Sequence, residues 1–233
     1  MEDINDWEVK YENCKYDDRL LTKLMQMNQE VNRPIDIKEV KKAIYYAKKY
    51  HGSQMRQSGE PYYSHPIEVA YMTSDYLFRT DIIVTSILQD TIEDTELSKS
   101  MIASIFGEQV ASQVMDITRI KEDGRKISSA EIMKLLYQQK KYDTLIIKLF
   151  DLLHNIQTIS AKSQEKAKKI IKETLQHFLV ICEIVEMPWL CEILYDKCCM
   201  NKPTLKQTSD NLFIFNKPFK LSGIPFFQNK TLL

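Results

Sequence analysis

The chain has 233 residues, of which 44% are hydrophobic and 27% charged, and its 32 Lys and Arg balance its 32 Asp and Glu. These are the values of an ordinary globular protein, and the neutral balance argues against a general nucleic-acid or membrane-surface binder. No apolar run is long enough to predict a membrane span. Only five glycines and seven prolines favour a helical fold over a loop-rich β fold.

The five cysteines are an odd number and form no C-x-x-C pair. The N-terminal sequence MEDINDWEVK is acidic and does not resemble a signal peptide. Both observations predict reduced, structural thiols in a cytoplasmic protein.

Hydrophobic residues recur with a helical period along most of the chain. Residues 1–16 are polar and are predicted to be poorly ordered, and a short amphipathic helix is predicted over 19–30. Asp36 is placed as the N-cap of a helix through Tyr50, which Gly52 ends.

The segment from Gly52 to His65 is predicted to be a loop, because its glycines and Pro61 prevent regular structure. Pro66 suits the first position of the next helix, which leaves His65 at the cap and extends the helix to about Phe78. A further apolar helix is expected to start at residue 80 or 81.

Downstream, Ser98 and Asp143 are expected to act as N-caps, and Ser128 with Glu131 has the spacing of a capping box. A polar connection is predicted at 121–126. The remaining helices are predicted at about 99–107, 108–118, 129–139, 145–159, 164–186 and 188–199. Every periodic segment is helical, which predicts an all-α fold.

An acidic cluster stands at the end of the apolar helix, in the sequence SILQDTIEDT. On one helix, Gln89 would lie one turn before Glu93, and Asp90 one turn before Asp94. Acids at this spacing repel each other unless a cation compensates. The cluster alone leaves two interpretations open: a divalent metal site, or a solvated helix end.

Asp90 and Asp151 each lie among apolar neighbours in the sequence. A buried carboxylate without a partner is costly, so each is expected either to be paired or to bind a metal ion.

Three segments in this order resemble the hydrolase domain of the Rel/SpoT family, within the HD superfamily of metal-dependent phosphohydrolases. They are the loop from Arg56 to Pro66, the acidic cluster and the sequence DLLHN at 151–155. The corresponding family patterns are R-x-S-G-E-P-Y-x-x-H-P, H-D-x-x-E-D and D-R-L-H-N. The resemblance extends from about Asp36 to about Met200.

This resemblance implies an HD-domain helical bundle over residues 36–200. It leaves residues 1–35 as an N-terminal extension with a short helix, and 201–233 as an extended tail rich in Pro and Phe that packs on the domain or binds a partner. Longer family members carry a synthetase domain after the hydrolase domain; the residues after 200 are too few to form one, so no synthetase activity is expected.

The resemblance also implies roles for individual residues. The metal ligands would be His65, Asp90 and Asp151, holding Mn²⁺ or another divalent ion, and Glu93 and Asp94 would orient and deprotonate water. The residues implied to bind the nucleotide are Arg56, Ser58, Asn155, Thr158 and Lys168. Lys168 could equally be a lysine on a solvated helix face, and His154 is interpreted as structural.

Three positions depart from the family pattern. Gln89 replaces a His ligand, Leu152 replaces an Arg, and Gln57 stands where a basic residue is common. An amide oxygen is a weaker donor than imidazole for ions such as Mn²⁺, so weaker metal binding is expected.

The leading hypothesis is a Mn²⁺-dependent hydrolase that converts ppGpp or pppGpp to GDP or GTP and pyrophosphate. One alternative is a catalytically impaired protein that binds ppGpp or a partner without hydrolysis, and another is a phosphohydrolase for a different nucleotide. The expected partner is the guanosine nucleotide, with no nucleic acid and no membrane. Self-association, or a partner bound through 201–233, is also considered.

Overall fold

The computed structural model describes residues 6–119, 126–175, 181–182, 185 and 187–200. Contacts divide the chain into two compact units, residues 1–162 and 163–233, which are described separately below. In the described ranges every regular element is a helix, and an isolated bridge pairs Met55 with Pro61. The predicted all-α fold is therefore confirmed.

The first unit contains eleven of the helices that the structure describes. In chain order they are α1 (Trp7–Lys10), α2 (Lys15–Met27), α3 (Ile37–His51), α4 (Ser64–Thr73), α5 (Thr80–Leu88), α6 (Thr91–Asp94), α7 (Lys99–Phe106), α8 (Glu108–Ile117), α9 (Ser129–Gln138), α10 (Tyr142–Gln157) and the 3₁₀ turn η1 (Ile159–Ala161). The second unit contains α11 (Gln164–Glu173) and α13 (Pro188–Met200).

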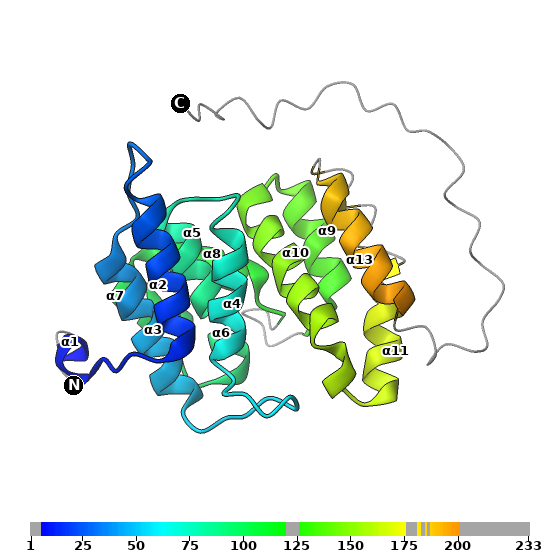
Figure 1. The fold of residues 1–233 in the computed structure, drawn as a ribbon, viewed down its shortest axis with the longest axis horizontal. Coiled ribbons are helices and arrows are strands. Elements are labelled where there is room, and N and C mark those ends of the chain that lie inside the picture. Colours follow the sequence, from blue (N-terminus) through cyan, green and yellow to red (C-terminus); the bar gives the residue numbers. More distant parts are fainter. Residues whose placement is uncertain (1–5, 120–125, 176–180, 183–184, 186, 201–233) are drawn as a thin grey trace. The chain divides into compact units, whose positions relative to one another are not determined.

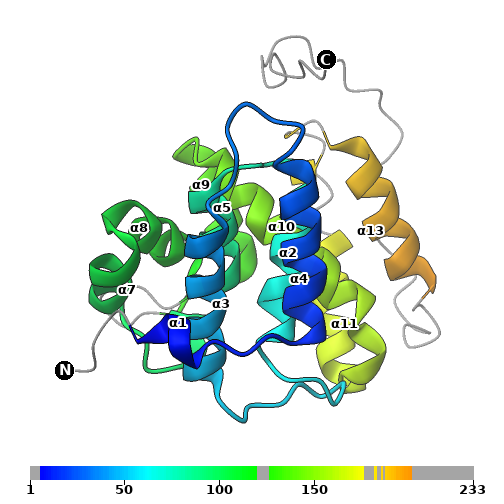
Figure 2. The ribbon, with the colours of Figure 1, turned by 60° about the vertical axis from the view of Figure 1, so that its left-hand side comes forward.

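Helix α5 lies at the centre of the first unit, where it contacts α3, α4, α8 and α10 (Figures 1 and 2). Its sequence TDIIVTSIL is apolar on several faces, and such a helix is stable only when neighbours surround it. Ile82, Ile83, Ile87 and Leu88 are accordingly fully buried. The end of α5, where the acidic cluster begins, is thus held on a rigid support.

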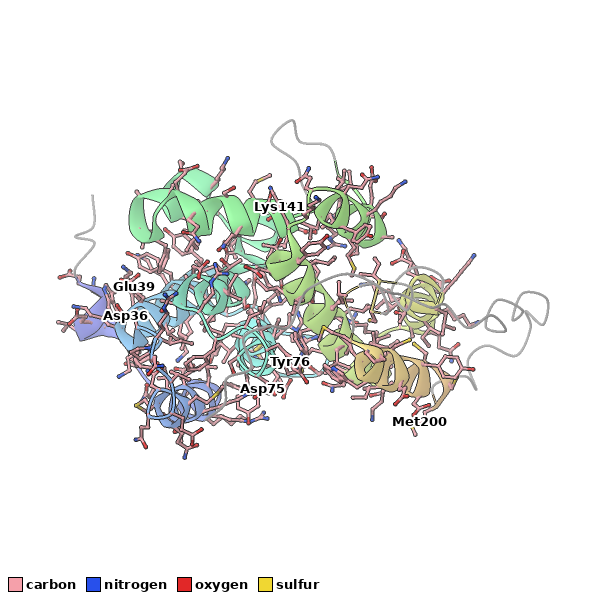
Figure 3. All side chains as sticks on the ribbon, turned by 90° about the horizontal axis from the view of Figure 1, so that it is seen from above. Asp36, Glu39, Asp75, Tyr76, Lys141 and Met200 are labelled. Atoms are coloured by element: carbon pink, nitrogen blue, oxygen red, sulfur yellow. The ribbon has the colours of Figure 1, made fainter. Side chains whose placement is uncertain are left out.

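Helix α10 packs against α4, and this contact brings two distant segments of the sequence together. The ring of Tyr76, just after α4 and labelled in Figure 3, lies 5.3 Å from the ring of Phe150 on α10. Phe150 is 2% exposed. His65 on α4 and Asp151 on α10 are brought close by this packing.

Several predicted helix ends are confirmed. The Asp36 carboxylate accepts hydrogen bonds from the backbone N–H groups of Lys38 and Glu39 at the start of α3 (Figure 3). Gly52 follows the helix with a φ of 52°, a conformation that glycine adopts without a steric cost. The Ser98 and Ser128 hydroxyls cap α7 and α9.

The N-terminal region differs from the prediction. Residues 1–16 are predicted to be poorly ordered, but α1 and the first two residues of α2 lie within the described part of this range, and Trp7 is 6% exposed. Helix α2 contributes Leu20, Leu21 and Leu24 to the hydrophobic core. The apolar face of α2 therefore belongs to the same core as α3, α4 and α5.

Two other helix starts were predicted wrongly. Helix α4 begins at Ser64, so His65 lies inside its first turn instead of at its cap, and Pro66 is tolerated there because the first-turn N–H groups have no helical acceptor. This helix also ends at Thr73, before the predicted Phe78. Asp143 does not cap α10; its carboxylate instead pairs with Arg79, 2.5 Å away.

Parts of the prediction fall outside the described residues, namely most of the connection at 121–126, part of the helix at 164–186 and the whole tail at 201–233. The limits of the predicted domain, 36–200, stay a prediction. No disulfide joins any of the cysteines in the part of the chain that the structure describes. A search of the described helices finds none long and apolar enough to cross a membrane.

Candidate metal and nucleotide site

The acidic cluster is carried by a helix break and not by one continuous helix. Helix α5 ends at Leu88, Gln89 and Asp90 form a turn, and α6 begins at Thr91. The predicted arrangement on a single helix is therefore wrong, although the Asp94 N–H still donates to the Asp90 carbonyl at 3.0 Å. As a result, the three carboxylates of the cluster have three different sets of partners.

His65 connects the two carboxylates that the sequence singled out as metal ligands. Its Nε2 lies 2.9 Å from Asp151 Oδ1 and 3.5 Å from Asp90 Oδ2. These residues come from α4, α10 and the turn after α5. The imidazole is 4% exposed, so the three side chains meet in a region largely shielded from water.

Asp151 is held by two further residues of its own helix. Lys148 Nζ donates to Oδ2 at 2.7 Å, and Asn155 Nδ2 donates to Oδ1 at 2.7 Å. Residues three and four positions apart lie on the same face of a helix, so α10 orients this carboxylate by itself. The bond from Asn155 also places this predicted nucleotide contact next to the metal candidates.

Charge in this region is balanced by the buried ammonium of Lys148. Burial alone would lower the pKa of Lys148, but the charges of Asp151 and Asp90 raise it above its ordinary value. Burial alone would raise the pKa of Asp151, yet Lys148 and His65 lower it. The pKa of Asp90 is raised, mainly by burial, and the neighbouring Asp151 charge adds to this.

The residues suit a divalent ion in type. Ligand atoms about 2.1 Å from one ion and at right angles lie about 3 Å apart, close to both distances measured from His65 Nε2. Gln89 is 2% exposed, and neither amide atom has a hydrogen-bond partner among the described residues. A buried amide without a partner is the kind of group that a bound ion or water satisfies.

The donor atoms of these side chains nevertheless do not surround a single position for an ion. In the part of the chain that the structure describes, no group of three or more His, Cys, Asp or Glu side chains is placed so that it could hold a metal ion as it stands. His65 Nε2 instead lies within hydrogen-bond distance of Asp151 directly. The donors therefore fit a metal ion in type and in two distances, and the assignment of His65, Asp90 and Asp151 as ligands stays a prediction.

Glu93 is fixed by two cations. The Arg119 side chain donates to both carboxylate oxygens of Glu93, from Nε to Oε2 at 3.0 Å and from Nη2 to Oε1. Lys126 Nζ lies 3.3 Å from Oε1. Burial would raise the pKa of Glu93, but Arg119 and Lys126 lower it overall. Glu93 is therefore ionised at neutral pH.

Asp94, the second acid of the pair, points to a different neighbour and is exposed. Its Oδ2 accepts a hydrogen bond from the Tyr62 hydroxyl at 2.6 Å, and its backbone carbonyl accepts one from Gln54. Burial and the charges of Asp90 and Asp94 raise the pKa of Tyr62, so the phenol stays protonated and donates.

The predicted nucleotide residues of the first unit are only partly brought together. Arg56 Nη2 donates to Thr158 Oγ1 at 3.2 Å, and Arg56 Nη1 lies 3.2 Å from His154 Nδ1. A cavity of about 390 Å³ lies beside Thr158 and His154, within the size range of small-molecule sites. Ser58 is exposed on the loop.

Lys168 lies on an exposed position of α11, in the second unit. The two units are not placed relative to each other, so its predicted contact with phosphate stays a prediction.

Sequence reasoning missed four residues of this region. Lys148 could have been found, because it lies three residues before Asp151 on an otherwise apolar helix. His154 was interpreted as structural, but it lies directly against His65. Tyr62 belongs to the loop motif from Arg56 to Pro66, but the motif did not indicate its contact with Asp94. Arg119 had no signal, because its contact with Glu93 joins segments that are far apart in the sequence.

Comparison with known proteins places the chain in a family. The sequence profile described as "HD domain" matches residues 43–181, which is more than half of the chain. The chain belongs to the HD domain family. The Rel/SpoT resemblance seen in the motifs is also confirmed by the curated relatives.

Two of these relatives illustrate the similarity. A GTP pyrophosphokinase of Myxococcus xanthus is 31% identical over 69% of the chain, and a guanosine-3′,5′-bis(diphosphate) 3′-pyrophosphohydrolase of Aquifex aeolicus is 36% identical over 61%. The matched regions are only 22% and 21% of these two proteins. The chain therefore corresponds to about a fifth of each relative.

One solved structure is also similar. It is titled as a metazoan ortholog of SpoT that hydrolyses ppGpp, and it aligns with 72% of this chain and 88% of its own at 19% identity and a TM-score of 0.49. At this level the likeness supports no inference about activity.

Proposed function

We propose that the chain is a metal-dependent phosphohydrolase that removes pyrophosphate from the 3′ position of ppGpp or pppGpp. The observation that carries the proposal is His65 Nε2 lying between the carboxylates of Asp90 and Asp151, on three separate elements. The name of the Aquifex aeolicus relative supplies the reaction and substrate class.

The metal ion would be held by His65, Asp90 and Asp151, with the amide oxygen of Gln89 as a weaker donor. When bound, a divalent ion such as Mn²⁺ polarises a phosphoryl oxygen and lowers the pKa of bound water. Lys148 keeps Asp151 ionised and oriented for this role.

The remaining residues act on water and the nucleotide. Glu93 is ionised and held in one orientation by Arg119, so it can accept a hydrogen bond from the attacking water, and Asp94 can take its proton. The water oxygen would bond to the phosphorus next to the ribose, and the bond from that phosphorus to O3′ would break. The proton that Asp94 takes from water would then pass to O3′, which leaves as the ribose hydroxyl, while the two phosphoryl groups leave together as pyrophosphate. Arg56, Ser58, Asn155 and Thr158 orient the nucleotide, with Lys168 on its phosphates.

A second function is favoured by two observations. Gln89 stands where the family pattern has an imidazole ligand, and the negative charge of Glu93 is already paired with Arg119 and Lys126. Both would suit a protein that binds ppGpp, or a partner, without hydrolysing it.

A turnover assay separates the two functions. Purified protein is incubated with ppGpp and Mn²⁺, the release of pyrophosphate and GDP is measured, and the metal content is determined on the same sample. The hydrolase proposal expects Mn²⁺-dependent release that Asp90→Asn abolishes. Binding of ppGpp without any release, in a sample that contains metal, would support the binding protein.

A further inference from the structure

Asp94, which the proposed function assigns to take a proton from water, lies on a weakly supported part of the backbone. It is the last residue of α6, a helix of only four residues, and its side chain is exposed. A single helical turn has little stability of its own, and an exposed carboxylate rotates freely unless a neighbour holds it. Contacts from outside α6 therefore set the position of this carboxylate.

Two residues of the loop after α3 provide these contacts. The Tyr62 hydroxyl donates to Asp94 Oδ2 at 2.6 Å, and Gln54 Nε2 donates to the Asp94 backbone carbonyl at 3.0 Å. The two loop residues are themselves joined, because the Tyr62 N–H donates to the Gln54 carbonyl at 2.9 Å. In the described part of the chain Asp94 Oδ1 has no partner, so it is the oxygen available to accept a proton from water.

His51, the last residue of α3, contacts both of these loop side chains. Its ring is stacked on the ring of Tyr62, with centroids 4.8 Å apart and planes inclined by 25°. Its Nδ1 lies 2.9 Å from Gln54 Oε1. The residue is 2% exposed, so these two neighbours belong to its buried surroundings.

The direction of the hydrogen bond between His51 and Gln54 follows from the Asp94 carbonyl. A backbone carbonyl only accepts, so the NH₂ group of Gln54 faces Asp94 and the amide oxygen faces His51. His51 Nδ1 therefore carries a proton and donates it to Gln54 Oε1. His51 Nε2 has no partner among the described residues. The hydrogen bond from this buried ring thus goes to the residue that holds the main chain of Asp94.

We propose that His51 is a positioning residue for Asp94, which stacks on Tyr62 and donates to Gln54 and so holds the two side chains that fix the carboxylate and the main chain of Asp94. The inference rests on the proposed function for the reaction that Asp94 serves, but the contacts are a property of the protein without metal or nucleotide. Helix α3 has 15 residues and packs against α5, so it is a firmer support than α6 itself.

The first test separates the two contacts of His51 by substitution. His51→Phe keeps a ring against Tyr62 but has no donor for Gln54, His51→Asn keeps a donor but no ring, and His51→Ala removes both. His51→Ala should lower kcat for ppGpp by about 10–100-fold, because small displacements of a catalytic group cost this much, and the other two variants should lower it less. In all three the KM should stay close to the wild type. Phe and Asn fill more of the buried site than Ala, so they keep the test valid if His51→Ala does not fold.

A merely structural role of His51 gives a different pattern. Arg56 and Ser58, which are predicted to bind the nucleotide, lie on the same loop, so a substitution that only disordered the loop would raise the KM. In an Asp94→Asn background, His51→Ala should lower the residual kcat no further, because Asp94 is the group through which His51 acts. A raised KM with unchanged kcat, or the full loss of kcat on top of Asp94→Asn, would overturn the inference.

A matched variant controls for loss of packing on the same helix. Val40 lies on α3 and is fully buried. Val40→Ala should lower the melting temperature without changing kcat or KM. A loss of kcat in Val40→Ala as large as in His51→Ala would assign the effect to the stability of α3 and would contradict the inference.

The second test needs neither a metal ion nor activity. In the metal-free wild type, ¹⁵N NMR at a pH where His51 is neutral should show its proton on Nδ1. Crystal structures should show the Tyr62 hydroxyl bonded to Asp94 in the wild type and separated from it in His51→Ala. A proton on Nε2, or an unmoved Asp94 in the variant, would overturn the inference. If the wild type hydrolyses no ppGpp, the proposed function fails, and these measurements still decide whether His51 positions Asp94.

Discussion

Gln89 is the residue at which this chain departs most from its family, and its surroundings give the departure a physical meaning. The side chain is 2% exposed and lies next to Asp90, and neither amide atom is hydrogen-bonded among the described residues. A buried amide in this state costs free energy, which a ligand would recover.

Gln89→His is expected to raise the affinity for Mn²⁺ by about tenfold, because imidazole is a better donor than an amide for this ion. Hydrolysis of ppGpp should rise less, since the new ring also needs an acceptor for its second nitrogen. Metal titration of the purified variant measures the first effect. Gln89→Leu is the control and should bind less Mn²⁺ than the wild type; identical affinities in all three proteins would show that residue 89 does not face the site.

The carboxylate of Glu93 is expected to make the free energy of unfolding depend on pH. Its folded-state pKa lies below the ordinary value of 4.5, so its ionised form stabilises the fold above that pH, and the contribution is lost as the pH falls through the folded value. At neutral pH it should amount to about 1 kcal/mol, because hydrogen bonds to charged groups contribute about 1.5–3 kcal/mol and Arg119 is partly exposed.

Urea unfolding of the wild type and Glu93→Gln measures this contribution. The free energies of unfolding should differ at pH 7 and converge toward pH 3. A difference that is the same at both pH values would rule out the assigned role of the Glu93 charge.

The residues that sequence analysis found and missed differ in one respect. His65, Asp90 and Asp151 were identified because motifs and lone acids in apolar surroundings leave a trace in the sequence. His154 and Arg119 were not, because their contacts with His65 and Glu93 depend on how separate segments meet in space. The direct contact between two imidazoles, in particular, exists only once α4 packs against α10.

At the scale of the elements, one buried carboxylate on α2 connects the N-terminal segment to α3. Asp17 is fully buried, pairs with Lys48 of α3, and accepts hydrogen bonds from the hydroxyl of Tyr11 and the backbone N–H of Cys14. The segment before residue 35, expected to be an extension, is thus joined to the core by polar contacts as well as by leucines.

Asp17→Ala should lower the free energy of unfolding by about 3 kcal/mol, because it leaves the Lys48 ammonium without its buried partner. Asp18→Ala, at the exposed neighbouring position, should change it by no more than about 0.5 kcal/mol. Chemical denaturation measures both. Equal effects of the two substitutions would contradict a stabilising role for the buried Asp17 ion pair.

Two aspartates test the difference between a helix cap and a surface ion pair. Asp36→Ala removes the cap of α3 and should cost about 1 kcal/mol. Asp143→Ala removes only an exposed pair with Arg79, and should cost less, about 0.5 kcal/mol. The two melting temperatures give the comparison, and a larger loss for Asp143 would mean that it supports α10 after all.

Helix breaks were harder to predict than helices. The sequence around Gln89 and Asp90 contains no Gly or Pro, so nothing local indicated that α5 would end at Leu88. The early start of α4 at Ser64 was missed for the opposite reason, because Pro66 suggested a boundary that the first turn of a helix does not require.

At the scale of the whole molecule, the all-α class followed directly from the helical period and the low content of glycine and proline. The division of contacts into residues 1–162 and 163–233 could not be predicted from the sequence, because the Rel/SpoT resemblance extends continuously from 36 to about 200. This division matters for Lys168, the only predicted nucleotide contact in the second unit.

Lys168→Ala tests the predicted phosphate contact and should raise the KM for ppGpp several-fold. Lys166→Ala is the matched control, since it is also exposed on α11 but points to a different side of the helix, and it should leave KM unchanged. Steady-state kinetics of both variants measure the effect. Equal KM values would assign Lys168 to an ordinary solvated surface.

The placement of Lys148, Asp151 and Asn155 on α10 has a mechanical consequence. A helix rises about 1.5 Å per residue, so the positions from Asp151 to Thr158 at its end are spaced over about 10 Å along one stiff rod. Any sliding or tilting of α10 moves this whole row together and leaves its internal spacing constant. The spacing between Asp151 and Thr158 is therefore constant. The distances from this row to Arg56 and His65 change only when the loop or α4, which carry those two residues, move relative to α10.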